Sequence, residues 1–364
     1  MIMGFQDDFG QALRQTARVF GGFRKLSEIR DEDVQIAQTP KDEVFRSDRA
    51  VLYHYRPLDE KPPETGPILI VYSLIGRYTV IDLQEDRSLV RNLLTRGCDL
   101  YVIDWGTPSR ADRFLTIDDY VDGYLADCVD HICRETGHDS ITLLGICEGG
   151  TFSAAFAALY PEKVKNLILT VTPIDFHADG EHNQQGQGYI NLWIRSLQPE
   201  DIDDLVETFG NLPGGLMASV FELISPIRSM TKYNRDLLEI IGDEDRLLNF
   251  LRMEKWLADR PDHPGEAAKQ WLKDLYHQNK LVKNEFRLSG RTVDLGQITM
   301  PILNIFAEND HIVPAACSSA LGGLVGSDDY TDVPLPGGHI GVFVSAKSQG
   351  LVGETIASWL RARN

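Results

Sequence analysis

The sequence predicts an α/β fold: a mostly parallel sheet with helices on both faces and an inserted helical cap. Three observations lead to this prediction. Short apolar runs alternate with helix-like segments from residue 67 onward, the alternation stops at about residue 174, and it resumes after about residue 290. Buried strands that alternate with helices are typical of parallel sheets covered on both faces. The interruption is too long for a plain loop, so we expect a helical insertion there.

Each expected element rests on a local pattern. The first strand is indicated by alternation of apolar and polar residues, and the later ones by short apolar runs bounded by turn residues. The expected strands are 51–56, 68–72, 99–104, 140–144, 166–172, 301–306 and 329–333. The expected helices are an amphipathic one within 5–30, then 87–96, 117–136, 148–159 and 347–362. Gly137 follows the third of these, where a left-handed C-cap favours glycine.

These elements divide the chain into three parts. Residues 1–40 form an N-terminal helical segment, residues 41–173 and 291–364 form the sheet domain, and residues 174–290 form the cap. We expect the cap to keep water out of the reaction site.

Composition excludes several classes of protein. The net charge of −18 argues against non-specific binding of nucleic acid, because phosphate contacts need lysine and arginine. The five cysteines lack the spacing of a disulfide framework or a zinc site, so we expect no metal. The N-terminus does not resemble a signal peptide, and no apolar run is long enough for a membrane span. We therefore expect a cytoplasmic protein without a transmembrane segment.

A nucleophile motif follows the strand 140–144 directly. Gly145-Ile146-Cys147-Glu148-Gly149 has the pattern glycine–any–nucleophile–any–glycine, and it opens the next helix. In the α/β-hydrolase fold this pattern is a tight strand-to-helix turn that exposes the nucleophile. The glycines are expected because the residues two before and two after the nucleophile should pass close to each other. A structural cysteine without chemistry is the alternative interpretation, and the downstream residues argue against it.

The acid and the base are expected at two later strand ends. In this fold the chain order is nucleophile, acid, base. Asp310 follows the strand 301–306 and His339 lies in a glycine-bracketed loop after the strand 329–333. His339 would accept the Cys147 proton, and Asp310 would orient the imidazole. Glu308 is the alternative acid and His311 the alternative histidine.

The remaining site predictions concern substrate contacts. The backbone N–H of Glu148 is the expected first oxyanion donor, and that of Leu74 or Ile75 the second. Arg77 is a candidate contact for an anionic substrate group, although an ion pair at the surface fits equally well. His311 is a second candidate substrate contact. The apolar stretch 212–221 either lines an acyl channel or forms the core of the cap.

Several longer segments extend the match beyond the nucleophile motif. Together they make the chain similar to the catalytic subunit of class III polyhydroxyalkanoate synthases over roughly residues 40–362. The segments are Leu143–Gly150, Asp104–Gly106, Leu115–Tyr120, Thr172–Phe176, Arg252–Trp256, Gln278–Leu281, Asp310 and Pro336–Gly341. The short chain suits class III, because classes I and II carry a long N-terminal extension.

The resemblance implies a substrate and a chemistry. Members of this family polymerise (R)-3-hydroxyacyl-CoA, such as 3-hydroxybutyryl-CoA, into polyester and release CoA through a thioester on the nucleophile. No cofactor is implied, since the CoA thioester is the substrate. The resemblance also implies a growing polyester chain, a second non-catalytic subunit of the PhaE type, a homodimer or hetero-oligomer, and a position at the polyester granule surface.

The sequence departs from the expected family pattern at two positions, and three alternative functions stay open. Glu148 stands where many relatives are expected to carry glutamine, and Gly76 stands where asparagine is expected. The alternatives are a thioesterase or polyester depolymerase of the same fold, an acyltransferase to a small alcohol, and a granule-coating scaffold. Product analysis separates the enzymes, and CoA release separates an enzyme from a scaffold.

Overall fold

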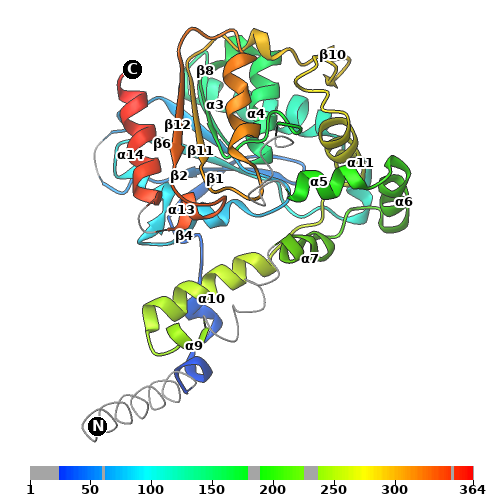
Figure 1. Ribbon diagram of the computed structural model, residues 1–364. Helices are drawn as coiled ribbons and strands as arrows, with labels where there is room; N and C mark the ends of the chain where they lie inside the picture. The colour runs from blue at the N-terminus through cyan, green and yellow to red at the C-terminus, as the bar shows by residue number, and fades with distance from the viewer. Residues whose placement is uncertain (1–23, 60–61, 179–188, 225–236, 346–347, 364) are drawn as a thin grey trace, which may run out of the picture.

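The computed structural model describes residues 24–59, 62–178, 189–224, 237–345 and 348–363. The helix expected within residues 5–30 lies mostly outside this range. An eight-stranded sheet forms the centre, in the order β1-β2-β6-β3-β7-β8-β11-β12 (Figure 1). Its strands are β1 (Lys41–Ser47), β2 (Ala50–Tyr55), β3 (Pro67–Val71), β6 (Asp99–Asp104), β7 (Ile141–Ile146), β8 (Val164–Thr170), β11 (Ile302–Ala307) and β12 (Tyr330–Leu335).

The sheet is parallel except at one edge. β1 pairs antiparallel with β2, and β2 antiparallel with β6. All five pairings from β6 through to β12 are parallel. The carboxyl ends of β7, β11 and β12 therefore lie at one edge of the sheet, and the three predicted catalytic side chains follow these strands.

Helices cover both faces of the sheet, as predicted. Side chains alternate along β3: Leu69 and Val71 pack into one hydrophobic cluster, while Ile68 and Ile70 pack into the other. The first cluster includes α3 (Ala126–Thr136) and α4 (Glu148–Leu159), and the second includes α2 (Leu89–Leu94) and α14 (Ser348–Arg361). Period-two alternation between two apolar layers explains why this strand is continuously hydrophobic.

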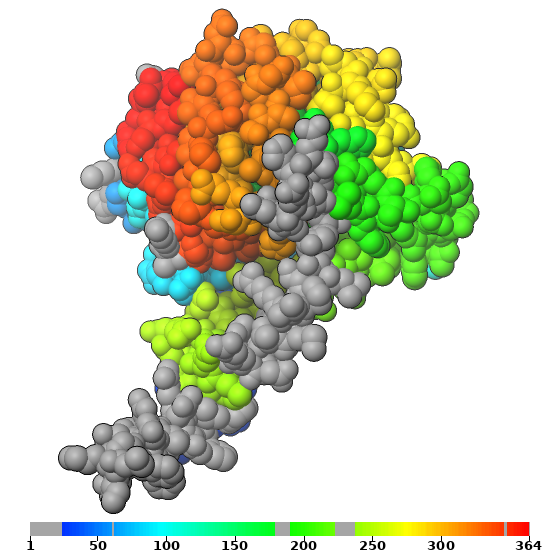
Figure 2. All heavy atoms as spheres, in the orientation of Figure 1, coloured from blue at the N-terminus to red at the C-terminus, as the bar shows by residue number. Residues whose placement is uncertain are grey.

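The chain between β8 and β11 is largely helical. It contains α5 (Tyr189–Ser196), α6 (Pro199–Phe209), α7 (Gly214–Ile224), α9 (Leu237–Ile240), α10 (Glu244–Ala258), α11 (Gly265–Lys269) and η8 (Gln270–His277). Figure 1 shows α9 and α10 extending away from the sheet, beside the described residues that precede β1, and the yellow-green atoms in Figure 2 mark the same two helices on the surface. Lys255 on α10 pairs with Asp31 at 2.7 Å, and Arg252 donates to the carbonyl oxygen of Asp33 at 3.0 Å.

Shorter elements complete the described chain. They are η1 (Asp31–Val34), η2 (Tyr78–Ile81), β4 (Asp82–Gln84), β5 (Arg87–Ser88), η3 (Arg110–Phe114), η4 (Asp119–Leu125), η5 (Pro161–Lys163), β9 (Arg287–Leu288), β10 (Arg291–Thr292), η9 (Leu295–Gln297), α12 (Ala315–Ser319), η10 (Ala320–Gly323) and α13 (Gly341–Val344). In the part of the chain that these elements span, no helix combines the length and apolarity needed to cross a bilayer.

Two helices differ from their predicted bounds. The helix expected over 87–96 begins only at Leu89, because Arg87 and Ser88 pair with β4 and Ser88 then caps the helix. The helix expected over 117–136 starts as a π-helical stretch, η4, before α3 continues to Thr136. Gly137 ends it in the left-handed conformation, at φ 73°, as predicted.

Candidate active site

Cys147 lies on a sharp turn between β7 and α4. Its backbone angles are φ 54° and ψ −126°, a conformation that non-glycine residues rarely adopt. The Cys147 N–H donates to the carbonyl oxygen of Thr170, which fixes the turn against β8. The Glu148 N–H comes next in the chain; as the first residue of α4, its N–H has no acceptor within the helix. This arrangement is the strand–turn–helix geometry that the sequence predicts.

The flanking glycines are required by close contacts around the turn. A Cβ on Gly145 would meet the Cα of Gly150 at 2.5 Å, and a Cβ on Gly149 would meet the carbonyl oxygen of Val71 at 2.2 Å. The nearest contacts of Gly145 are with α4, and those of Gly149 are with the end of β3. Because Gly149 packs on the end of β3, the turn is also tied to the loop that follows β3.

His339 and Asp310 form the expected pair. His339 Nδ1 lies 2.7 Å from Asp310 Oδ2, and both side chains are buried. The other carboxylate oxygen of Asp310 accepts the N–H groups of Ile312 and Val313, each at 2.9 Å. Glu308, the alternative acid, is exposed and lies outside this contact.

The pKa of His339 is raised well above its ordinary value. Burial alone would lower it, but the charge of Asp310, the charge of Cys147 and hydrogen bonds to both stabilise the imidazolium more strongly. The imidazole thus interacts with Asp310 on one side and with Cys147 on the other. Such an arrangement can accept a thiol proton and hold the resulting charge.

The carboxylate of Glu148 is fully buried and makes three polar contacts. Its Oε2 accepts from the Ser73 hydroxyl at 2.9 Å and from the Leu74 N–H at 2.8 Å. Its Oε1 lies 2.9 Å from Nε2 of His263, whose side chain is also buried. The residue after the nucleophile therefore joins the loop after β3 to the segment between α10 and α11.

These contacts involve both of the N–H groups that were predicted as the second oxyanion donor. The Leu74 N–H is bonded to Glu148, and the Ile75 N–H donates to Ser73 Oγ at 3.0 Å. Neither predicted N–H is unengaged in this structure. An oxyanion could use one of them only after its present hydrogen bond is exchanged.

Sequence reasoning missed His263. A buried carboxylate at position 148 requires hydrogen-bond donors, so the need for a partner follows from the motif. The identity of that partner does not, because His263 lies 115 residues further along the chain. The His263 backbone also exchanges two hydrogen bonds with Leu212, at 2.8 and 2.9 Å, so two segments of the helical insertion meet at this residue.

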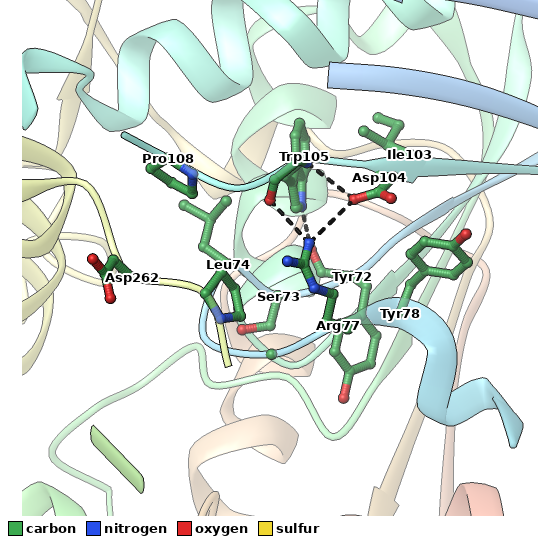
Figure 3. A pocket seen from close by; sticks show the side chains of 13 residues that line it. Tyr72, Ser73, Leu74, Arg77, Tyr78, Ile103, Asp104, Trp105, Pro108 and Asp262 are labelled. Carbon is green, nitrogen blue, oxygen red and sulfur yellow. Dashed lines mark hydrogen bonds and ion pairs between the residues drawn. The ribbon is translucent and has the colours of Figure 1, made fainter. Parts of the chain in front are cut away.

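Arg77 makes hydrogen bonds to neighbouring loops and does not line the apolar cavity that contains Cys147. Its guanidinium donates to the Gly106 carbonyl at 3.1 Å, to Thr107 Oγ1 at 2.6 Å and to Asp259 at 3.2 Å. Figure 3 shows the side chain pointing toward Asp104 beneath Trp105. The adjacent pocket of about 20 Å³ has room for about one water molecule. The structure thus favours the ion-pair interpretation of Arg77 over the predicted substrate contact.

A larger apolar cavity of about 270 Å³ opens on the nucleophile. Cys147, His339 and His311 all contribute to its wall. The predicted apolar stretch is also there, since Leu212, Leu216, Met217, Val220 and Phe221 line it. Asp310 is not among the lining residues, so it contacts His339 from behind. Within the described ranges, no cluster of three or more histidine, cysteine, aspartate or glutamate residues could hold a metal ion.

Comparison with known proteins agrees with this geometry. A parallel sheet with a nucleophile at the β7–α4 turn and an acid–histidine pair after later strands defines the α/β-hydrolase fold, and the family described by that name matches residues 66–346. Solved structures share the fold: a yeast monoglyceride lipase has a TM-score of 0.54 at 12% identity, covering 91% of this chain and 96% of that one. A monoacylglycerol lipase from Paleococcus ferrophilus has a TM-score of 0.53 at 16% identity, covering 84% and 97%.

Closer relatives identify the family. Residues 31–93 match the N-terminal region of poly-beta-hydroxybutyrate polymerase, PhaC. The poly(3-hydroxyalkanoate) polymerase subunit PhaC of Synechocystis sp. is 45% identical over 362 residues, covering 99% of this chain and 94% of that protein. The subunit from Allochromatium vinosum is 43% identical over 359 residues, covering 98% of each. The chain belongs to the poly(3-hydroxyalkanoate) polymerase family, whose members are acyltransferases, as the resemblance predicts.

Proposed function

We propose that the chain polymerises (R)-3-hydroxyacyl-CoA, with 3-hydroxybutyryl-CoA as the expected monomer, through a thioester on Cys147. The observation that carries this proposal is that Cys147 and His339 line one apolar cavity, with Asp310 bonded to His339 from behind. The family membership supplies the reaction class, and the cavity supplies an apolar place for a short acyl chain.

The first half-reaction loads the enzyme. His339 takes the Cys147 proton, and the thiolate attacks the thioester carbonyl while the Glu148 N–H stabilises the oxyanion. The bond between the carbonyl carbon and the CoA sulfur breaks, and CoA leaves as a thiol with the proton from His339. An acyl group then remains on Cys147 as a thioester.

The second half-reaction extends the chain. The 3-hydroxyl of another hydroxyacyl group attacks the Cys147 thioester, its proton passes to His339, and the Cys147 thiolate leaves as an ester forms. Both oxygens of the Asp310 carboxylate are already engaged, by His339 and by two backbone N–H groups. This supports an orienting role for Asp310 over direct assistance to the hydroxyl.

The surroundings and partners follow from the same chemistry. Apolar cavity walls keep water from the acyl-enzyme, whose hydrolysis would end the chain. The reaction needs no cofactor, because exchange of a thioester for an ester is driven by the CoA thioester itself. His311 lines the cavity, and we propose that it contacts substrate there. We also propose that the chain acts together with a second, non-catalytic subunit and forms a homodimer or hetero-oligomer. The site of action in this proposal is the polyester granule surface.

Product analysis tests the function. The purified chain is mixed with 3-hydroxybutyryl-CoA in the presence of the second subunit, free thiol is followed with a colour reagent, and the product is examined. Thiol release with precipitating polyester supports the proposal. Thiol release with only soluble 3-hydroxybutyrate would identify a thioesterase, and no release would contradict an enzymatic role on this substrate.

Replacement of the nucleophile tests the covalent step. Cys147→Ala should remove CoA release entirely, because no other cysteine lies in the described wall of the cavity. Cys317→Ala is a control, since that cysteine is buried near α12 and outside the cavity lining. Mass spectrometry of the wild-type chain after brief exposure to substrate should find the acyl group on the peptide that contains Cys147. CoA release by Cys147→Ala would overturn the mechanism.

A further inference from the structure

One permanently charged side chain, that of Arg260, reaches the cavity beside Cys147. Among the described residues that line this cavity, it is the only lysine, arginine, aspartate or glutamate. It lies between α10 and α11, three positions before His263, in the segment that His263 ties to Glu148. Its backbone is therefore held in place close to the catalytic turn.

The Arg260 guanidinium packs against an aromatic ring, and its buried Nε–H lacks an acceptor in the part of the chain that the structure describes. Its central carbon lies 4.6 Å from the centre of the Phe221 ring. Its Nε is buried and has no hydrogen-bond partner among the described residues. Burial lowers the pKa of Arg260, against the opposing effects of Tyr72 and Glu222. Arg77, by contrast, has its acceptors within the fold.

Tyr72 relates Arg260 to the nucleophile. The Tyr72 ring lines the same cavity, and its pKa is raised by burial and by the charge of Cys147, while Arg260 opposes the rise. Tyr72, Cys147 and Arg260 line the same cavity, so a group carried on Cys147 shares this cavity with Arg260. The group that Cys147 would carry in this cavity is the acyl group and not the nucleotide of CoA.

We propose that Arg260 binds ester carbonyl oxygens of the polyester chain carried on Cys147. Buried N–H donors without acceptors are costly, and a ligand that supplies acceptors removes that cost. The polar atoms of a polyester of hydroxy acids are carbonyl and ester oxygens and one terminal hydroxyl, all able to accept. The contact with the Phe221 ring uses none of the hydrogen-bond donors of the guanidinium, so its N–H groups stay available for these oxygens. The proposal rests on the proposed function, because it needs the acyl chain at Cys147.

The test compares substrates with and without an internal ester. The monomer 3-hydroxybutyryl-CoA has only its thioester carbonyl, whereas the linear trimer thioester adds two ester carbonyls. Arg260→Met keeps an apolar stem and removes the donors. We expect it to lower kcat/KM for CoA release by about 10-fold or more with the trimer, and by no more than about 3-fold with the monomer.

Pantetheine thioesters separate ester binding from phosphate binding, because they lack the phosphates of CoA. The selective loss with the trimer should persist when both substrates are offered as pantetheine thioesters. Equal losses for monomer and trimer, or a loss that disappears without the phosphates, would overturn the proposal. Failure of the proposed function looks different: wild-type protein would then show no Cys147-dependent thiol release from any of these substrates.

Two further variants guard against a merely structural effect. Arg291 also stacks on an aromatic ring, that of Tyr160 at 4.5 Å, but it pairs with Asp122 and lies outside the cavity lining. Arg291→Met should therefore leave the ratio of trimer to monomer activity unchanged. Phe221→Leu removes only the stacking ring and should reproduce the selective loss at about 3-fold. It serves as the test if Arg260→Met does not fold, and an unchanged ratio in Phe221→Leu would then count against the proposal.

Discussion

Two buried imidazole–carboxylate pairs lie on either side of the nucleophile turn. In one, His339 Nδ1 is 2.7 Å from Asp310; in the other, His263 Nε2 is 2.9 Å from Glu148. The pairs are alike in chemistry, burial and distance, yet their surroundings differ. His339 interacts with Cys147 through its other side, whereas Nδ1 of His263 lies 3.3 Å from the carbonyl oxygen of Pro264. Because only the imidazole of His339 faces the thiol, we expect the His339 pair to act in catalysis and the His263 pair to position the loop after β3.

The largest loss of activity is expected when the His339 pair is disabled. Asp310→Asn should keep the shape of the site but remove the charge that orients and stabilises His339. We expect kcat to fall by about 10²–10⁴-fold, as for other acid–histidine–nucleophile sites. Thiol release from 3-hydroxybutyryl-CoA measures it. Glu308→Gln is the matched control, because that carboxylate is exposed nearby, and a similar loss in the control would reverse the assignment of the acid.

Disabling the His263 pair should cost less activity and more stability. Glu148→Ala or His263→Ala leaves one buried polar partner unsatisfied, which typically costs about 3–5 kcal/mol of unfolding free energy. Because Glu148 also fixes the Leu74 N–H, we expect kcat to fall by about 10-fold with KM changed less. Urea unfolding and steady-state kinetics measure the two effects, and a double-mutant cycle gives the coupling between the residues. Additive losses in the cycle would mean that the two side chains act independently.

The pH dependence of stability should identify the His339 pair specifically. A raised folded-state pKa means that folding favours the protonated imidazole, so its contribution is complete below the ordinary pKa of 6.5 and is lost as pH rises through the raised value. Relative to His339→Gln, the wild-type chain should therefore lose unfolding free energy between about pH 6 and alkaline pH. Chemical denaturation at several pH values measures the difference. A gap between the two proteins that stays constant or widens with pH would contradict the sign.

The smallest loss of activity is expected for a change at Arg77, which tests the role of the loop after β3. Arg77 holds the same loop from the other side, through Gly106, Thr107 and Asp259. Because three partners share its hydrogen bonds and Asp259 is half exposed, we expect Arg77→Ala to lower kcat/KM by only about 2–3-fold. Steady-state kinetics on 3-hydroxybutyryl-CoA measures this. A loss as large as that of His263→Ala would show that general loosening of the loop, and not the buried pair, limits the reaction.

The contrast between the pairs also explains what the sequence could predict. Cys147, Asp310 and His339 follow three parallel strands, and each lies in a motif whose position in this fold is known in advance. Periodicity and apolar runs were enough to locate those strands. The contact between His339 and Asp310 could therefore be expected before any coordinates.

The missed features depend on packing of the helical insertion, which no local pattern encodes. His263 lies in a short connection between helices, and only the folded chain brings it to Glu148. The same applies to Arg77, whose acceptors come from the loop after β6 and from the segment after α10. The neighbours of Gly145 and Gly149 were likewise invisible, since they depend on how closely α4 approaches β3.

The buried carboxylate at position 148 has a consequence for how this site can diverge. An amide at the same position could still accept from Ser73 and Leu74 through its oxygen, and it could donate to an uncharged His263 through its nitrogen. Glutamate and glutamine codons differ by a single base. A lineage could thus pass between the two residues in one step, without an intermediate that lacks a partner for His263. Each passage would change the charge beside the nucleophile while the surrounding hydrogen bonds stay in place.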